Sequence, residues 1–323
     1  MTRLSDRALA HLREVADRPD TSGTKYDIIE PIGRGGMGTV YRARDRELDR
    51  DVAFKVLRDP APGGDGAARM LREARVLARL EHPGLVPVHD VGTLPDGRPY
   101  YVMKLVRGEP LDAYVRAART SLEERLRILQ RLCEAVAFAH AHGVIHRDLK
   151  PQNVMIGRFG EVLVMDWGVA KVAGAPPDDG ACSTAPPTPG DTAPGTVLGT
   201  PGYMPPEQAA GGAADVDERA DVFALGAVLG FLLDAPRDIA GAIPPALRAI
   251  RARATAPARE DRYPSADGLA ADVARFLDRL PVSVHREGAL ERVARVAGKY
   301  RGALVLVAAY LLMRALLLAF GGR

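Results

Sequence analysis

This chain of 323 residues has little cysteine, little aromatic content and little lysine. Its two cysteines, Cys133 and Cys182, cannot build a disulfide framework, and neither lies at a spacing typical of metal ligands. Such sparse cysteine predicts that the folded part lies in the cytosol. A net charge of +3 is too small to indicate a nucleic-acid partner, and we expect none. The N-terminus also lacks the apolar core of a signal peptide.

The composition is that of a globular protein, with 47% hydrophobic and 26% charged residues. It excludes a wholly disordered chain. Lysine accounts for only six of the 44 basic residues, and the others are arginine. Where the chain keeps a lysine, the chemistry of a compact ammonium group is therefore a candidate reason. The six are Lys25, Lys55, Lys104, Lys150, Lys171 and Lys299.

Hydrophobic patterns divide the chain into a β-rich first part and a helical second part. We predict a short helix and linker within residues 1–25, and strands over 26–60 and 85–106. Between the two groups of strands we predict a helix that ends near Leu80. After Gly108 the pattern becomes mostly helical.

Local signals mark two helices and one loop in the second part. Ser121 and Glu124 form a capping box that opens a helix, and Gly143 can end it. Residues 221–233 are apolar on all sides, which predicts a fully buried helix. Residues 173–198 are rich in Pro, Ala, Gly and Thr, and we predict a mobile loop there.

The C-terminal run over residues 302–320 is apolar except for Arg314. As a helix it would be about 28 Å long, close to the hydrocarbon core of a bilayer. Arg314 adds about 2.5–3.5 kcal/mol to the free energy of membrane insertion. The Leu, Val and Phe residues of the run offset this cost at roughly 0.3–0.6 kcal/mol each. Residues 286–301 form a basic flank, so we predict a single-pass membrane anchor with the folded part on the cytoplasmic side. The alternative is an amphipathic or core-docked helix.

A G-x-G-x-x-G-x-V motif lies within the first group of predicted strands. Its residues are Ile32, Gly33, Arg34, Gly35, Gly36, Met37, Gly38, Thr39 and Val40. The same glycine spacing opens dinucleotide-binding folds, where it leads into a helix. Here a second and a third strand pattern follow, which favours a hairpin flap folded over phosphates. A plain glycine-rich turn is the simpler alternative.

Three further stretches carry side chains suited to phosphoryl chemistry. Lys55 lies in the predicted third strand, and Glu73 lies on the next helix, where it could hold the ammonium group. Asp148 can orient an attacking hydroxyl, Lys150 can offset phosphoryl charge, and Asn153 can bind a metal. Asp166 follows an apolar strand and can bind Mg²⁺. These motifs in this order leave little room for chance. The six residues to which we assign these roles are Lys55, Glu73, Asp148, Lys150, Asn153 and Asp166.

With these motifs the sequence resembles the bacterial eukaryotic-like serine/threonine protein kinases over residues 26–280. The resemblance implies an α+β, bilobal protein-kinase fold with a β-rich N-lobe carrying one helix and a mainly helical C-lobe. We predict five units on this basis. They are residues 1–25 (helix and linker), 26–106 (N-lobe), 107–281 (C-lobe, with 173–198 as an insert in the activation segment), 282–301 (basic juxtamembrane segment) and 302–320 (transmembrane helix).

The resemblance also implies ATP and Mg²⁺, which Mn²⁺ could replace, and roles for further residues. The expected nucleotide-binding residues, besides the glycine motif with Lys55 and Glu73, are Val40, Ala53, Met103, Lys104, Leu105, Val106 and Met155. Glu207 is expected to pair with Arg262, and Asp221 to hold the backbone of the His146–Arg147 turn. Thr200 is expected to contact Asp148 and Lys150, and with Lys150 it indicates serine or threonine as the acceptor in protein substrates.

Departures from the family pattern motivate an alternative. Trp167 replaces the usual phenylalanine, and we expect it to pack with His146 and Leu77. The region over residues 234–243 is short, which leaves substrate docking open. A nucleotide-binding, membrane-anchored pseudokinase scaffold is therefore the main alternative, and a small-molecule kinase a weaker one. We further expect autophosphorylation on the activation segment, at Thr192 or Thr196, and a homodimer would allow this in trans.

Overall fold

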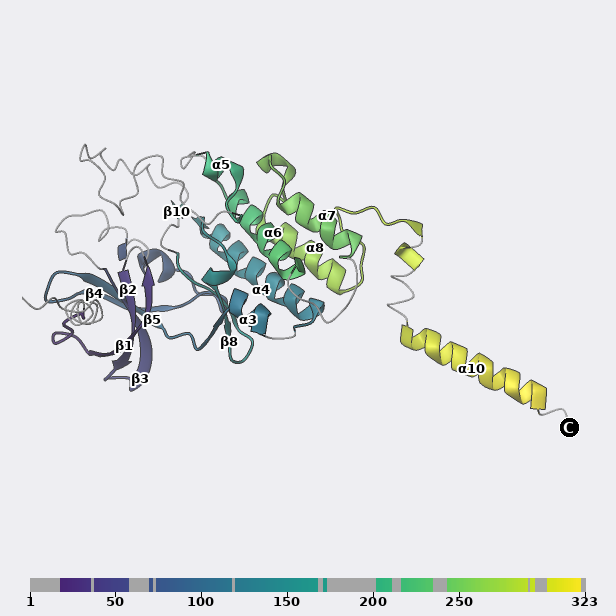
Figure 1. The fold of residues 1–323 in the computed structure, drawn as a ribbon, viewed down its shortest axis with the longest axis horizontal. Coiled ribbons are helices and arrows are strands. Elements are labelled where there is room, and N and C mark those ends of the chain that lie inside the picture. Colours follow the sequence, from purple (N-terminus) through teal and green to yellow (C-terminus); the bar gives the residue numbers. More distant parts are fainter. Residues whose placement is uncertain are drawn as a thin grey trace, which may run out of the picture.

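The computed structural model places a small β-rich lobe beside a larger helical lobe (Figure 1). It describes residues 18–35, 38–57, 70–71, 74–117, 120–167, 171–172, 202–210, 216–234, 243–289, 291–293 and 301–320. The predicted N-terminal helix, the start of the helix that ends near Leu80 and the 173–198 loop lie outside these residues. The described part has the predicted bilobal architecture.

The N-lobe is built on one five-stranded antiparallel sheet in the order β1-β2-β3-β5-β4. The strands are β1 (Tyr26–Gly35), β2 (Gly38–Asp45), β3 (Arg50–Leu57), β4 (Val88–Thr93) and β5 (Pro99–Lys104). Alternating apolar residues let one sheet face bury an aromatic cluster, in which the Phe54 and Tyr100 rings stack with centroids 4.5 Å apart. Strands are thus confirmed within both predicted ranges, 26–60 and 85–106, except at residues 36–37 and 58–60, which lie outside the described residues.

The C-lobe packs helices around one apolar core. Its helices are α3 (Leu111–Ala117), α4 (Leu122–Ala141), α5 (Pro206–Ala209), α6 (Arg219–Asp234), α7 (Pro245–Ala254) and α8 (Ala266–Leu277). Short 3₁₀ turns span Pro151–Asn153 and Arg259–Asp261. The helix predicted over 221–233 is buried on nearly every side, as its composition requires. The Ser121 side chain caps α4 by accepting from the Glu124 N–H, and Gly143 follows its end with φ +74°.

Five short strands in the described part of the chain lie among the helices of the C-lobe. They are β6 (Gly108–Pro110), β7 (Val144–Ile145), β8 (Val154–Gly157), β9 (Val162–Val164) and β10 (Lys171–Val172). β8 lies between β6 and β9, and β7 pairs with β10. Gly108 is required in β6, because an added Cβ would lie 2.1 Å from the carbonyl oxygen of Ile156.

The predicted C-terminal helix is present as α10 (Arg301–Phe320), which extends away from the helical lobe (Figure 1). Side chains are described over residues 305–315, and all of them are exposed. Among the residues that the structure describes in full, no helix is both long and apolar enough to cross a membrane.

Candidate active site

The glycine motif lies at the tip of the β1–β2 hairpin. Gly33 pairs with Val40, and Gly35 pairs with Gly38. The hairpin continues into β2 and not into a helix, which rules out the dinucleotide-binding alternative. Gly38 leaves no room for a side chain, because a Cβ would lie 2.1 Å from the Val56 carbonyl oxygen on β3. Within the motif, Ile32 and Arg34 are exposed, whereas Gly36 and Met37 lie outside the described residues.

The residues expected around adenine gather in one apolar cluster. Ala53 on β3 pairs with Met103 on β5, and both are buried. Val40, Val106 and Met155 pack against this cluster and remain only partly buried. Leu105 packs there too, while the Lys104 side chain is exposed and its N–H donates to the Pro87 carbonyl. The cluster therefore joins apolar residues of both lobes, of the kind that pack against a flat apolar ring.

Lys55 is a buried cation in the N-lobe, with 7% of the residue exposed. Its Nζ lies 3.5 Å from Oδ1 of Asp166 and 5.3 Å from the centroid of the Tyr101 ring. The predicted partner, Glu73, lies outside the described residues. Asp166 follows β9, has φ +57° and keeps 60% of its side chain exposed. Lys55 and Asp166 thus form an ion pair between the lobes.

Asp148 lies at the centre of a cluster of polar side chains on the catalytic loop, residues 146–153. Lys150 Nζ donates to Asp148 Oδ2 at 2.7 Å. Asn153 Nδ2 donates to the Asp148 carbonyl at 2.8 Å and to Oδ2 at 3.2 Å. Since Nδ2 faces Asp148, Oδ1 is the Asn153 atom available to a cation. Asn153 is 7% exposed, so this orientation is held by its surroundings.

The donor set fits a hard divalent cation that also binds phosphate oxygens. Asp166 offers an exposed carboxylate and Asn153 an amide oxygen, and both are oxygen ligands of the kind that Mg²⁺ prefers. Within the described ranges, no three or more His, Cys, Asp or Glu residues are grouped so that they could hold a metal ion. The missing ligands would have to come from a bound nucleotide and from water.

The backbone of the catalytic loop is held by Asp221 at the start of α6, as predicted. Its carboxylate accepts from the N–H groups of His146 and Arg147, each at 2.8 Å, and from His140 Nε2 at 2.8 Å. Asp221 is 1% exposed. Burial acts to raise the pKa of Asp221, but hydrogen bonding to His140 and the nearby His146 outweigh it and lower that pKa.

Glu207 on α5 forms the predicted pair with Arg262. The two carboxylate oxygens of Glu207 accept from Nη1 and Nη2 of Arg262 at 2.6 and 2.8 Å. The Arg262 side chain is fully buried and also donates to backbone carbonyls, among them that of Ala256. Burial acts to raise the pKa of Glu207, but the hydrogen bonds and the charge of Arg262 act to lower it, and the pKa is lowered overall. Thr200 and the proposed phosphorylation sites Thr192 and Thr196 lie outside the described residues.

Trp167 packs where it was predicted. Its ring centroid lies 4.6 Å from that of His146, and it belongs to the same core cluster as Leu77. The side chain is 2% exposed, and its Nε1 donates to the Val164 carbonyl at 3.4 Å. The larger indole is thus accommodated in the core beside the catalytic loop.

Two polar residues at this site were missed by the sequence analysis. His140 reaches Asp221 from α4, and Gln208 donates from Nε2 to the Arg147 carbonyl at 2.9 Å. The partners lie 81 and 61 positions apart, so no local pattern connects them. For Gln208, the one available signal was its position directly after Glu207.

The arrangement suits transfer of a phosphoryl group. A carboxylate that can orient a hydroxyl lies beside an ammonium, Lys150, that can offset developing negative charge. A second ammonium, Lys55, lies beside a carboxylate that can bind a metal. The apolar cluster around Ala53 and Met103 could receive the base of a nucleotide.

Comparison with known proteins gives the same family. The model of the protein kinase domain matches residues 26–239. The DNA damage-responsive serine/threonine-protein kinase RqkA of Deinococcus radiodurans is 40% identical over 223 residues, which are 65% of this chain and 30% of that protein. A probable serine/threonine-protein kinase of Streptomyces coelicolor is 36% identical over 294 residues, covering 82% of this chain and 42% of that protein.

The chain therefore spans less than half the length of these two curated relatives. Among solved structures, the crystal structure of the Mycobacterium tuberculosis PknI kinase domain is similar with a TM-score of 0.55 and 28% identity. That match covers 78% of this chain and 96% of the PknI domain. The fold, the geometry of the site and these matches lead to one conclusion: the chain belongs to the protein kinase domain family, with bacterial serine/threonine kinases as its relatives.

Proposed function

We propose that this protein is a serine/threonine kinase that transfers the γ-phosphoryl group of ATP to hydroxyl groups of protein substrates. The observation that carries the proposal is the cluster of Lys150 and Asn153 on Asp148, together with the Lys55–Asp166 pair that links the lobes. The relatives named above are serine/threonine kinases, which supports the same activity here.

Asp148, Lys150 and Lys55 then each contribute to a single phosphoryl-transfer step. The acceptor oxygen forms a bond to the γ-phosphorus as the bond from phosphorus to the β-phosphate bridging oxygen breaks. Asp148 orients the hydroxyl and accepts its proton, while Lys150 offsets negative charge on the transferring group. Lys55 orients the phosphates of ATP from the N-lobe. Most of the rate enhancement then comes from positioning and electrostatics.

Asn153 and Asp166 are the residues that would hold Mg²⁺. When bound, the cation would neutralise charge on the phosphates and help to fix their orientation. Ala53, Met103 and Val106 would contact the adenine, and the hairpin of β1 and β2 would cover the phosphates. The Lys150 position and the expected Thr200 contact support serine and threonine over tyrosine as acceptors.

Autophosphorylation in the activation segment, at Thr192 or Thr196, is part of the proposal. Arg147 is a half-buried cation beside Asp148, and burial lowers the pKa of its guanidinium, an effect that Asp221 opposes. A phosphate near Arg147 would bond this cation and order the segment. A homodimer would allow the reaction in trans. Phosphosite mapping of active protein tests this, and finding neither threonine modified would refute it.

The assay of the main proposal compares the full chain with Asp148→Asn. Both are incubated with labelled Mg-ATP and a generic basic protein in detergent. Label in wild type but not in Asp148→Asn supports the kinase. Asp278→Asn, an exposed carboxylate at the end of α8, serves as the matched control and should remain active. If all three proteins bind nucleotide and none of them transfers label, the result would instead indicate a pseudokinase scaffold.

We also propose that α10 attaches the protein to the cell membrane as a single-pass anchor, with the kinase domain in the cytoplasm. Its described apolar residues are exposed, with Leu306, Leu311 and Leu312 at 56–72%, and a basic segment precedes the helix. Flotation with lipid vesicles, followed by alkaline washing, tests this. The full chain should remain with the vesicles, whereas release by the wash would contradict a spanning helix.

A further inference from the structure

Arg147 has a backbone conformation that L-residues rarely adopt. Its φ is +70°, in the left-handed region, where a residue with a Cβ is strained. Such strain persists only where the surroundings determine the conformation. The two peptide groups on either side of the Arg147 Cα must therefore both be held in place.

The peptide group before Arg147 is held by Asp221. The Arg147 N–H donates to Asp221 Oδ1 at 2.8 Å, and the His146 N–H donates to Oδ2 at the same distance. Because Asp221 is buried on α6, this contact determines the direction of the chain as it enters Arg147. The contact with Asp221 does not hold the next peptide group, between Arg147 and Asp148, whose orientation determines the position of the Asp148 backbone.

The peptide group between Arg147 and Asp148 is held at both ends by side chains. At one end, Gln208 Nε2 donates to the Arg147 carbonyl at 2.9 Å. At the other end, the Asp148 N–H donates to His146 Nδ1 at 3.3 Å. The His146 ring is itself fixed, since its Nε2 donates to the Met165 carbonyl at 2.9 Å and the ring packs against Trp167. The shorter of the two contacts on this peptide group comes from Gln208.

We propose that Gln208 is a positioning residue for phosphoryl transfer: its amide fixes the plane of the Arg147–Asp148 peptide group and thereby aims the Asp148 carboxylate. This inference rests on the proposed kinase function. Gln208 does not touch the reacting atoms, but acts through the backbone. An error of about 1 Å in the position of a catalytic group can cost on the order of a hundredfold in rate, so such an anchor matters.

The position of Gln208 in the chain makes it a link between two parts of the C-lobe. It follows Glu207 on α5, and Glu207 is fixed by the buried Arg262. The segment of residues 202–210 is therefore anchored on one side to Arg262 and reaches the catalytic loop on the other. A displacement of α5 would release the Arg147 carbonyl and change the orientation of Asp148.

The first test is Gln208→Met, which keeps the length of the side chain and removes its N–H donor. We expect kcat to fall about tenfold, the effect of one lost hydrogen bond. The KM for ATP should stay unchanged, because the nucleotide-binding residues are not touched. The matched control is Gln130→Met on α4, which removes the same donor from an exposed bond to Glu134. A kcat for Gln208→Met equal to that of the control would overturn the proposal.

The second test is Gln208→Glu, which separates positioning from general stability. At neutral pH the introduced carboxylate would repel the Arg147 carbonyl oxygen, and kcat should fall at least as far as in Gln208→Met. As the pH is lowered and the carboxyl group gains a proton, its O–H can donate to that carbonyl. The ratio of variant to wild-type kcat should therefore rise with acidity. A ratio that does not change with pH would contradict positioning by this bond.

Hydrogen exchange distinguishes failure of this inference from failure of the proposed function. The Asp148 N–H is measured in full-length wild type, Gln208→Met and Gln130→Met. Faster exchange in Gln208→Met alone supports the anchor even if wild type transfers no phosphate, in which case only the kinase proposal fails. Equal exchange in all three proteins overturns the inference.

Discussion

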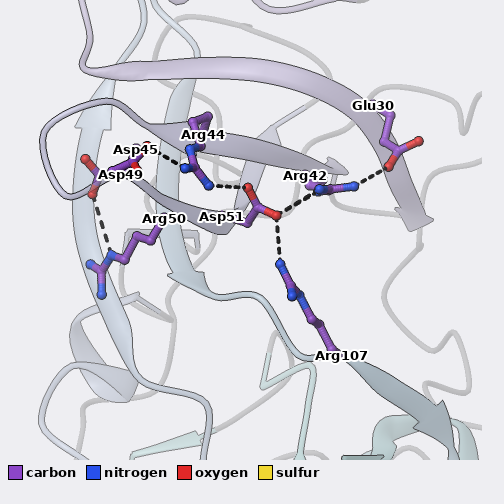
Figure 2. A network of polar contacts seen from close by, with 8 residues as sticks. All are labelled: Glu30, Arg42, Arg44, Asp45, Asp49, Arg50, Asp51 and Arg107. Carbon is purple, nitrogen blue, oxygen red and sulfur yellow. Dashed lines mark hydrogen bonds and ion pairs between the residues drawn. The ribbon is translucent and has the colours of Figure 1, made fainter. Parts of the chain in front are cut away.

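Asp221 in the C-lobe and Asp51 in the N-lobe each accept hydrogen bonds from three residues, but these residues differ in kind. Asp221 is buried, and two of its donors are backbone N–H groups. Asp51, at the start of β3, binds Arg42, Arg44 and Arg107 (Figure 2). These arginine side chains are 38–61% exposed. The Asp51 side chain is itself only 8% exposed, so the two carboxylates differ in their partners. Asp221 holds a buried backbone, whereas Asp51 organises exposed arginine side chains.

The difference shows that a count of contacts does not measure their importance. Removing Asp221 would leave buried N–H groups without an acceptor, which costs the full desolvation of each. The arginines around Asp51 can turn to water instead, and salt screens their attraction. Arg107 lies in the segment between β5 and β6, so the surface network also links the N-lobe to the start of the C-lobe.

The largest expected effect comes from Asp221→Ala. It should destabilise the protein by about 3–5 kcal/mol, the usual result of removing one partner from a buried charged network. Phosphoryl transfer should also fall below detection, since the His146–Arg147 turn loses its anchor. Thermal unfolding and the kinase assay measure the two effects. If this variant does not fold, Asp221→Asn, which keeps one oxygen acceptor, should fold and still lose most of its activity. Normal activity in Asp221→Asn would contradict the role of the buried carboxylate.

An intermediate effect is expected for Glu207→Gln, which leaves the buried Arg262 without its carboxylate. We expect a loss of about 1–2 kcal/mol at neutral pH, measured by chemical denaturation. The folded-state pKa of Glu207 is lowered from the ordinary 4.5, so its contribution is full above that value. It is lost as the pH falls through the folded-state pKa. Wild type and variant should therefore become equally stable in acid, and a difference that persists there would argue against this pair.

A smaller effect is expected for Asp51→Asn, because Arg42, Arg44 and Arg107 are exposed. The hydrogen bonds from Arg42 and Arg44 lower the pKa of Asp51, so its carboxylate is charged at neutral pH. Stability should fall slightly in dilute buffer, and the difference from wild type should vanish at high salt. A stability loss as large as that of Asp221→Asn, or one insensitive to salt, would show that Asp51 and Asp221 contribute to stability in the same way.

The smallest expected signal is optical and reports on the buried region alone. Trp167 is the only tryptophan of the chain, and it packs against His146. Saturating Mg-ATP should change its emission spectrum, since Asp166, its neighbour, would bind the metal. The change should persist in Asp51→Asn and be reduced in Asp166→Asn. Emission unaffected by the nucleotide in wild type would contradict this placement.

Sequence alone predicts the features that depend on neighbouring residues. The glycine hairpin followed from the strand patterns on both sides of Gly33 and Gly38, and the cap of α4 followed from Ser121 and Glu124. The fully buried α6 followed from its composition. In each case the physical cause lies within one helix or one hairpin, so a local pattern can record it.

Contacts between distant residues were predicted only where the family resemblance supplied them. The hold of Asp221 on Arg147, 74 positions away, and the Glu207–Arg262 pair belong to this group. The Lys55–Asp166 pair and the contacts of His140 and Gln208 were not predicted. Nothing local marks a buried glutamine as the donor to a particular carbonyl, because folding, and not spacing, creates that contact.

The left-handed backbone at Arg147 has a consequence for how this position can vary. Glycine adopts φ near +70° without strain, and β-branched residues do so worst. In a library of variants selected only for soluble expression, glycine should therefore be enriched at this position. Selection for phosphoryl transfer should restore the arginine. Comparing the two selections would show how much folding stability the chain gives up to keep a cation beside Asp148.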